Sequence, residues 1–180
     1  MRIISGKHKG RRITAPKNLP IRPTTDLAKE SLFNILNNRV HFSGLQVLDL
    51  CAGMGNISYE FGSRGASQIT CVDENAGCTK FIQQTAKDFD FPISVIKADI
   101  FKYLENTTQQ FDVIFADPPY SFEQSQFDKI VQLVFQQNLI NEDGILIIEH
   151  SKVTDFENHP NHTETRKYGG SLFSFFEVNP

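Results

Sequence analysis

The tetrapeptide Asp117-Pro118-Pro119-Tyr120 follows directly on the apolar run 111–116 (FDVIFA). Neither proline can extend a strand, because proline has no backbone N–H to donate to a sheet. The Asp117 carboxylate and the Pro118 carbonyl can instead accept hydrogen bonds, and the prolines hold both acceptors rigidly. The Tyr120 ring can stack on a planar group. These groups are suited to the exocyclic amine of a nucleobase that has left its stack, because two acceptors draw its N–H bonds out of conjugation and make the nitrogen nucleophilic.

Three more acids stand at the ends of apolar runs. Asp49 lies in "LDLCAGMGN", where Gly53 and Gly55 form a turn, and Asp73 and Asp99 follow two further runs. In an open parallel sheet the carboxyl ends of the strands share one edge, and ligands bind there. We therefore expect these acids and the tetrapeptide to meet at one site. Glycines in the turn allow positive φ and close approach of a ligand to the backbone.

The acids and glycines at this predicted sheet edge discriminate between cofactors. A dinucleotide site requires a third glycine where this chain has Ser58, and no basic residue occurs in 49–60 to attract a phosphate. An acidic edge suits a cationic sulfonium, which indicates S-adenosylmethionine, with Asp73 placed to accept hydrogen bonds from ribose hydroxyls. We expect no metal, because methyl transfer from sulfonium to nitrogen is an in-line displacement. The expected cofactor-binding residues are Asp49, Ala52, Gly53, Gly55, Asp73, Glu74, Asp99 and Ile100.

Apolar runs and helical stretches alternate along most of the chain. Strands are predicted at about 46–50, 68–72, 93–97, 111–116 and 145–149, with helices at about 56–63, 75–88, 100–105 and 124–137. Such alternation, with strands apolar on both faces, indicates an α/β fold with a doubly wound, mostly parallel sheet. The tail differs, because "TETRKY" and "SLFSFFEV" flank Gly169-Gly170 and predict a C-terminal antiparallel hairpin.

The first 40 residues form a basic extension. Residues 1–25 hold seven of the 18 basic residues and none of the 21 acidic ones. "RIIS" and "RRITA" predict a small hairpin around "GKHKG", and Thr25 is expected to cap a helix that runs to about Asn38. That helix is expected to have an apolar face of Leu27, Leu32, Ile35 and Leu36.

Uncompensated cations are what phosphate contacts require, so this extension, residues 1–40, is expected to bind RNA while residues 41–180 form the catalytic domain. The predicted RNA-binding residues are Arg2, Lys7, Lys9, Arg11, Arg12 and Arg22.

Bulk properties exclude several classes. No apolar run approaches the roughly 20 residues of a membrane helix, and the N-terminus lacks the apolar segment of a signal peptide. The three cysteines are odd in number and show no C-x-x-C spacing, so neither a disulfide framework nor a zinc site is indicated. We expect a cytoplasmic protein that contacts no membrane.

Five motifs in order resemble the RsmD family of bacterial 16S rRNA methyltransferases: "MRIISGKHKGRRI", "RPTTDLAKESLFNIL", "VLDLCAGMGN", "FDVIFADPPY" and "KYGGSLFSFF". The resemblance covers nearly the whole chain. It implies a Rossmann-like class I methyltransferase that modifies the N2 amine of a guanine, by resemblance guanine 966, in 16S rRNA or an assembling small ribosomal subunit. It also assigns Asp49, Gly53 and Gly55 to the cofactor loop, Asp73 to the ribose, Asp99 to the adenine, Asp117 to Tyr120 to catalysis, and Arg22-Pro23-Thr24 to the vicinity of the active site.

Some positions depart from the family pattern, and two other functions stay open. Cys51 replaces a common Phe, Met54 a common Ser or Thr, and "GGS" a more usual Gly-acid-Thr, which leaves the role of the C-terminal hairpin open. One alternative is an adenine N6 methyltransferase acting on DNA or RNA, which normally carries a target-recognition domain. The other is a non-catalytic rRNA-binding assembly protein.

Overall fold

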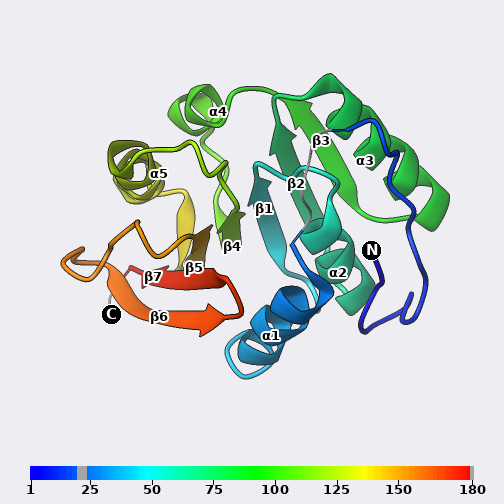
Figure 1. Cartoon of the computed structure of the whole chain (residues 1–180), viewed down its shortest axis with the longest axis horizontal. Helices are drawn as coiled ribbons and strands as arrows, with labels where there is room; N and C mark the ends of the chain where they lie inside the picture. Colours follow the sequence, from blue (N-terminus) through cyan, green and yellow to red (C-terminus); the bar gives the residue numbers. More distant parts are fainter. Residues whose placement is uncertain (20–23, 179–180) are drawn as a thin grey trace.

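A computed structural model describes residues 1–19 and 24–178, and its described part is built around a seven-stranded sheet (Figure 1). The strands are β1 (Gln46–Leu50), β2 (Gln68–Asp73), β3 (Ile93–Lys97), β4 (Phe111–Ala116), β5 (Ile140–His150), β6 (His162–Tyr168) and β7 (Ser171–Glu177). The helices are α1 (Asp26–Leu36), α2 (Asn56–Arg64), α3 (Ala76–Phe89), α4 (Ile100–Asn106) and α5 (Gln124–Gln136).

The strand order is β3-β2-β1-β4-β5-β7-β6, with β1 to β5 parallel and β7 antiparallel to both of its neighbours. The chain reverses its direction of winding at β1, which pairs with β2 on one side and β4 on the other. Such a switch point opens a crevice at the carboxyl ends of the strands. The predicted doubly wound sheet and C-terminal hairpin are confirmed.

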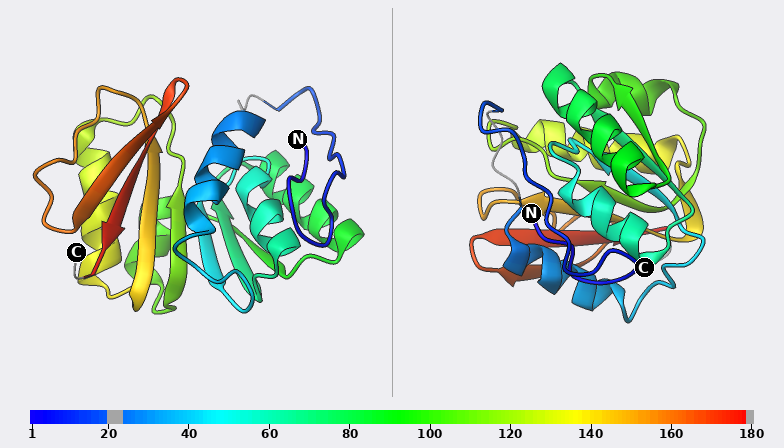
Figure 2. Two further views of the ribbon diagram at one scale, coloured as in Figure 1. Left: turned by 90° about the horizontal axis from the view of Figure 1, so that it is seen from below. Right: turned by 90° about the vertical axis from the view of Figure 1, so that its right-hand side faces the viewer.

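Alternate residues of the central strands pack into two separate hydrophobic cores, one on each face of the sheet. Val47 and Val113 pack with α1, α2 and α3 on one face, whereas Leu48 and Ile114 pack with α4 and α5 on the other. Figure 2 shows these helical layers on either side of the sheet. Coverage of both faces explains why the strands read as continuous apolar runs. Strand β5 begins at Ile140, earlier than predicted, because Ile140 pairs with Phe111 before the register between the two strands shifts.

Helix α1 begins at the predicted cap, since the Thr25 hydroxyl accepts from the Ala28 N–H at 3.2 Å. Its predicted apolar face was partly wrong. Leu27 is 68% exposed, whereas the buried face consists of Ala28, Lys29, Leu32, Phe33 and Leu36. A helix buries positions three and four apart, and Leu32 and Leu36 share that face with Ala28 rather than with Leu27.

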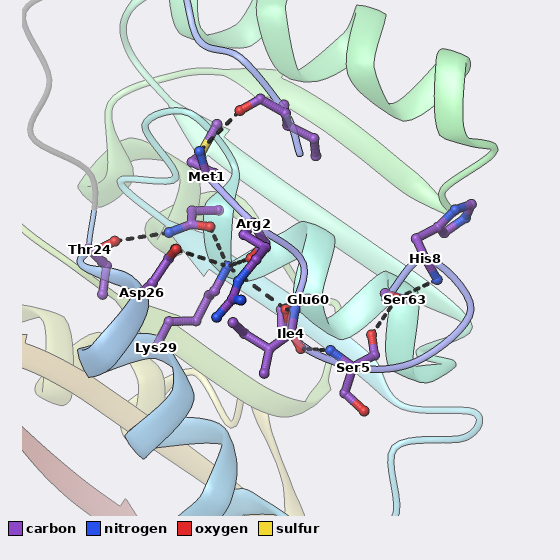
Figure 3. Close-up of polar contacts among 12 residues, drawn as sticks. Met1, Arg2, Ile4, Ser5, His8, Thr24, Asp26, Lys29, Glu60 and Ser63 are labelled. Atoms are coloured by element: carbon purple, nitrogen blue, oxygen red, sulfur yellow. Dashed lines mark hydrogen bonds and ion pairs between the residues drawn. The ribbon is translucent and has the colours of Figure 1, made fainter. Parts of the chain in front are cut away.

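The N-terminal segment folds back on itself as the predicted small hairpin, with an antiparallel bridge between Arg2 and Arg12. The Ile3 N–H donates to the Arg11 carbonyl at 2.9 Å, and the Ile13 N–H donates to the Met1 carbonyl at 3.0 Å. Other backbone donors of the segment have partners on α2. The Ile4 and Ser5 N–H groups donate to the Glu60 carboxylate at 2.8 and 3.0 Å (Figure 3). Gly6 approaches α2 so closely that a Cβ there would lie 1.8 Å from the Ser63 carbonyl oxygen.

A buried lysine ties this segment to α1 and α2. The Lys29 Nζ atom, on a side chain that is 1% exposed, donates to the Arg2 carbonyl at 2.6 Å and to Asn56 Oδ1 at 2.8 Å. The fully buried Glu60 carboxylate lies 3.8 Å away and supplies the opposite charge (Figure 3). Burial is the largest influence on the pKa of Lys29 and lowers it, while Glu60 opposes this shift.

Among the helices that the structure describes, none is long and apolar enough to cross a membrane.

Candidate active site

A cavity of about 1120 Å³ lies at the switch point of the sheet. It brings together all four predicted acids, which come from the ends of β1 to β4. The predicted residues that line it are Asp49, Ala52, Gly53, Asp73, Glu74, Asp99, Ile100, Asp117, Pro118, Pro119 and Tyr120. The spacing of acids along the sequence therefore predicted a shared location correctly.

The loop after β1 is held in place by Asp73. One carboxylate oxygen of Asp73 accepts from the Gly53 N–H at 2.8 Å, and the other accepts from the Asn75 N–H at 2.8 Å. Gly55 does not line the cavity but precedes α2 with φ +76°, and a Cβ there would lie 2.7 Å from the Tyr59 ring. Gly55 thus shapes the loop through its backbone conformation and its contact with Tyr59.

Asp49 lies beneath this loop and is 1% exposed. Its carboxylate accepts from the Ser58 hydroxyl at 2.5 Å. Burial, reinforced by the charge of Asp73, raises the pKa of Asp49 to about 7, although the hydrogen bond from Ser58 opposes the shift. A cationic group in the cavity would favour the ionised form of this carboxyl.

Asp99 is the N-cap of α4, where its side chain accepts from the Lys102 N–H at 3.0 Å. It lines the cavity together with Ile100 and Phe101. The Phe101 ring stacks on Phe122 with centroids 5.8 Å apart, so the loop after β4 packs against α4. This contact joins the region around Asp99 to the Asp117-Pro118-Pro119-Tyr120 loop.

That loop leaves β4 with the Asp117 N–H donating to the Leu50 carbonyl at 3.3 Å. It then turns, with the Phe122 N–H donating to the Pro119 carbonyl at 3.0 Å. The Tyr120 side chain is 77% exposed at the cavity wall, and Leu27 on α1 is similarly exposed at the same cavity. An exposed aromatic ring beside rigid acceptors fits the predicted stacking role of Tyr120.

Sequence reasoning missed Glu149, a buried carboxylate near the end of β5 that lines the same cavity. The Thr24 hydroxyl lies 3.2 Å from Glu149 Oε2 and 3.5 Å from Asp117 Oδ2, so it spans the two acids. The other Glu149 oxygen accepts from the Ser171 hydroxyl at 2.6 Å. Burial raises the pKa of Asp117 well above its usual range, and the neighbouring Glu149 raises it further. The signal was available, because an acid interrupts the apolar run "ILIIEH" just as Asp49 interrupts "VLDL".

Thr24 also links the site to the N-terminal segment. Its carbonyl accepts from Asn56 Nδ2 at 3.0 Å, and Asn56 Oδ1 in turn accepts from Lys29. The predicted basic residues Arg2, Lys7, Lys9, Arg11 and Arg12 are exposed and do not line the cavity. Arg22, the sixth of the predicted RNA-binding set, lies outside the described residues.

The charges of the cavity fit S-adenosylmethionine. Six carboxylates line it, and within the described chain none of the lining residues is Lys, Arg or His. Such a wall repels phosphate and attracts a cation. The ring of acids at the carboxyl ends of β1 to β4, on a seven-stranded sheet whose last strand is inserted antiparallel, defines a Rossmann-like class I methyltransferase.

Comparisons with known proteins identify the family. The model of the family described as "Conserved hypothetical protein 95" matches residues 1–177. Ribosomal RNA small subunit methyltransferase D of Haemophilus influenzae is 31% identical over 157 residues, which cover 84% of this chain and 79% of that protein. The chain belongs to this family, the RsmD family of methyltransferases.

Solved structures agree on the fold. A hypothetical protein of Thermus thermophilus superposes with a TM-score of 0.84 at 23% identity, covering 99% of both chains. A 16S rRNA N2-guanine methyltransferase of Thermus thermophilus (RsmC), solved with S-adenosylmethionine and guanosine, gives a TM-score of 0.69 at 19% identity. This likeness covers 88% of the present chain and 45% of that one.

Proposed function

We propose that this chain methylates the exocyclic N2 amine of a guanine in 16S rRNA, with S-adenosylmethionine as the methyl donor. The observation that carries the proposal is the position of Asp117 and Pro118 in the wall of an acid-lined cavity that contains no basic lining residue in the described chain. Relatives named for small-subunit rRNA methylation support the choice of RNA.

The residues around the glycine loop would hold the cofactor. Asp73 would accept from the ribose hydroxyls while it holds the loop through Gly53, and Asp99 and Ile100 would lie against the adenine. Asp49 would balance the positive charge. When bound, S-adenosylmethionine supplies an electrophilic methyl group on a cationic sulfur. The chain's own task is to present an amine to that methyl group and exclude water from it.

Asp117 and the Pro118 carbonyl would accept the two N–H bonds of the amine. The acceptors need no rearrangement during the reaction, since the prolines and the packing of Phe122 on Phe101 fix the loop. Tyr120 would stack on the flipped base, a contact worth roughly 1–3 kcal/mol. The exposure of Tyr120 and Leu27 at the cavity suits a base that arrives from an unpaired region.

The basic side chains of the N-terminal segment would bind the phosphates of the RNA. Five of its basic side chains are exposed, and the segment is fixed to α2 through Glu60. A folded, cationic surface of this kind positions a polyanion without reading its sequence. The division of the chain at residue 40 into an RNA-binding extension and a catalytic domain remains part of this proposal.

The test is methyl transfer from labelled S-adenosylmethionine to small ribosomal subunits, and to free 16S rRNA, from a strain that lacks this gene. Nucleoside analysis should show N2-methylguanosine, and mapping should place it at guanine 966. N6-methyladenosine would establish the adenine alternative instead.

Failure to transfer a methyl group, together with no change in melting temperature on addition of S-adenosylmethionine, would favour the non-catalytic alternative. A cofactor at 100 times its dissociation constant should add roughly 2.7 kcal/mol of stability. Asp117→Ala is the negative control of the methyl-transfer assay, because it lacks the carboxylate that accepts from the amine.

A further inference from the structure

Glu149 and Asp117 form a pair of neighbouring carboxylates with too few donors. The Thr24 hydroxyl has one proton, and it lies within reach of both Glu149 Oε2 at 3.2 Å and Asp117 Oδ2 at 3.5 Å. It can donate to only one of them at a time. Ser171 supplies a second donor, but to the other oxygen of Glu149.

Both acids face a cavity that offers them no cation within the described chain. Glu149 is only 8% exposed, so water satisfies few of its acceptor positions. Buried acceptors without donors are costly, and two adjacent carboxylates also repel each other. A ligand that brings two adjacent N–H donors on one edge would give each acid a donor and so favour the ionised form that accepts.

Guanine has such an edge, because N1–H stands beside the N2 amine and both are donors. Adenine has the N6 amine beside N1, which carries a lone pair rather than a proton. A carboxylate opposite that lone pair would repel it. The position next to the amine therefore distinguishes the two purines.

We propose that Glu149 accepts the N1–H of the target guanine while Asp117 accepts from the N2 amine, and that Glu149 thereby selects guanine over bases with an unprotonated N1. The inference rests on the proposed function and names a specificity-determining residue for it. Thr24 and Ser171 are positioning residues, since their hydroxyls fix the rotamer of Glu149. Ser171 lies directly after the Gly169-Gly170 turn, which gives the C-terminal hairpin a role at the site.

The competing explanation is that Glu149 only ties β5 to Thr24 and Ser171. A structural role predicts that substitution of Glu149 affects all substrates equally. A specificity role predicts that it changes the ratio between two substrates. The pair to compare is guanine and 2-aminopurine, because 2-aminopurine keeps the C2 amine but has a lone pair at N1.

The experiment uses 16S rRNA joined from synthetic segments, with guanine or 2-aminopurine at the position that the enzyme modifies. We expect kcat/KM of the parent protein to favour guanine by about 100-fold or more, as for sites built around a substrate N–H. Glu149→Gln should lower kcat/KM for guanine and bring the preference to within about tenfold, since its amide can donate to the unprotonated N1.

Glu142→Gln is the matched control, because Glu142 lies on the same strand and is exposed. It should keep the preference of the parent. An unchanged preference in a folded Glu149→Gln variant would overturn the inference. Equal rates for the two bases with the parent protein would overturn it without any variant, whereas no methylation of guanine at all would overturn the proposed function and this inference with it.

Discussion

Replacing Asp49 with Asn should make the protein more stable at neutral pH and should flatten the dependence of its stability on pH. In the native protein burial holds the pKa of Asp49 at about 7, whereas its ordinary value is 3.8. The native state therefore keeps a proton on Asp49 between these values, and the unfolded state does not. Stability from this group is fully present below pH 3.8 and is lost as pH rises through 7.

The size of the effect follows from the two values. The interval from 3.8 to about 7, at about 1.4 kcal/mol per pH unit, gives a loss of about 4 kcal/mol. Of this, about 2.5 kcal/mol falls between pH 5 and pH 8. Asn has the same shape, can still accept from Ser58 through its side-chain oxygen, and does not titrate.

The assay is urea unfolding of the parent and of Asp49→Asn without cofactor at pH 5, 6, 7 and 8. The free energy of unfolding of the variant should gain on that of the parent by about 2.5 kcal/mol across this range. The change of the parent's unfolding free energy with pH would not by itself isolate the contribution of Asp49. The pKa values of His8 and His150 are lowered, so these groups make the protein more stable as pH rises, in the opposite direction. Asp143→Asn, at an exposed position, should run parallel to the parent. A constant difference between Asp49→Asn and the parent would refute the reasoning.

Three further outcomes are expected. Asp117→Ala should lower kcat for methyl transfer at least about 100-fold while calorimetric affinity for S-adenosylmethionine largely survives, and activity within tenfold of the parent would contradict its role as acceptor. Asp73→Ala should weaken cofactor binding by about 1–3 kcal/mol, because it loses the ribose contacts and releases Gly53; unchanged affinity by calorimetry would exclude this. Removal of four exposed charges should weaken RNA binding and flatten its log–log salt dependence by about 0.7–0.9 per lost phosphate contact, with cofactor affinity retained. An RNA affinity and salt slope equal to those of the parent would rule out the segment as an RNA-binding element. The four substitutions are Lys7→Ala, Lys9→Ala, Arg11→Ala and Arg12→Ala.

The acids of the site were predictable because the physics that places them is regular. Apolar runs identify the strands, and a parallel sheet brings the carboxyl ends of its strands to one edge, so Asp73 and Asp117 had to be neighbours although they are far apart in sequence. Glu149 follows the same rule, but it lies inside its strand rather than after it. Its significance depends on Thr24 and Ser171, which reach it from the two ends of the chain.

Long-range polar contacts were not predictable in this way. A lysine in a helix normally faces solvent, and Lys29 is buried only because Arg2, Asn56 and Glu60 meet it from other segments. The N-terminal hairpin was predictable from its strand-like residues, but its contact with α2 was not, since the Ile4 and Ser5 N–H groups donate to Glu60. Local pattern carries no information about such partners.

The position of β7 between β5 and β6 has a consequence for synthesis of the chain. Of the described strands, β7 is the last to be translated, yet it occupies an interior place in the sheet and pairs on both sides. The half of the protein that contains the glycine loop can therefore assemble while translation continues, but β5 keeps an open edge until β7 inserts. Because Ser171 is the first residue of β7, Glu149 gains its second hydroxyl donor only at that step. A nascent chain would thus have the residues that surround the cofactor before it has a complete pocket for the base.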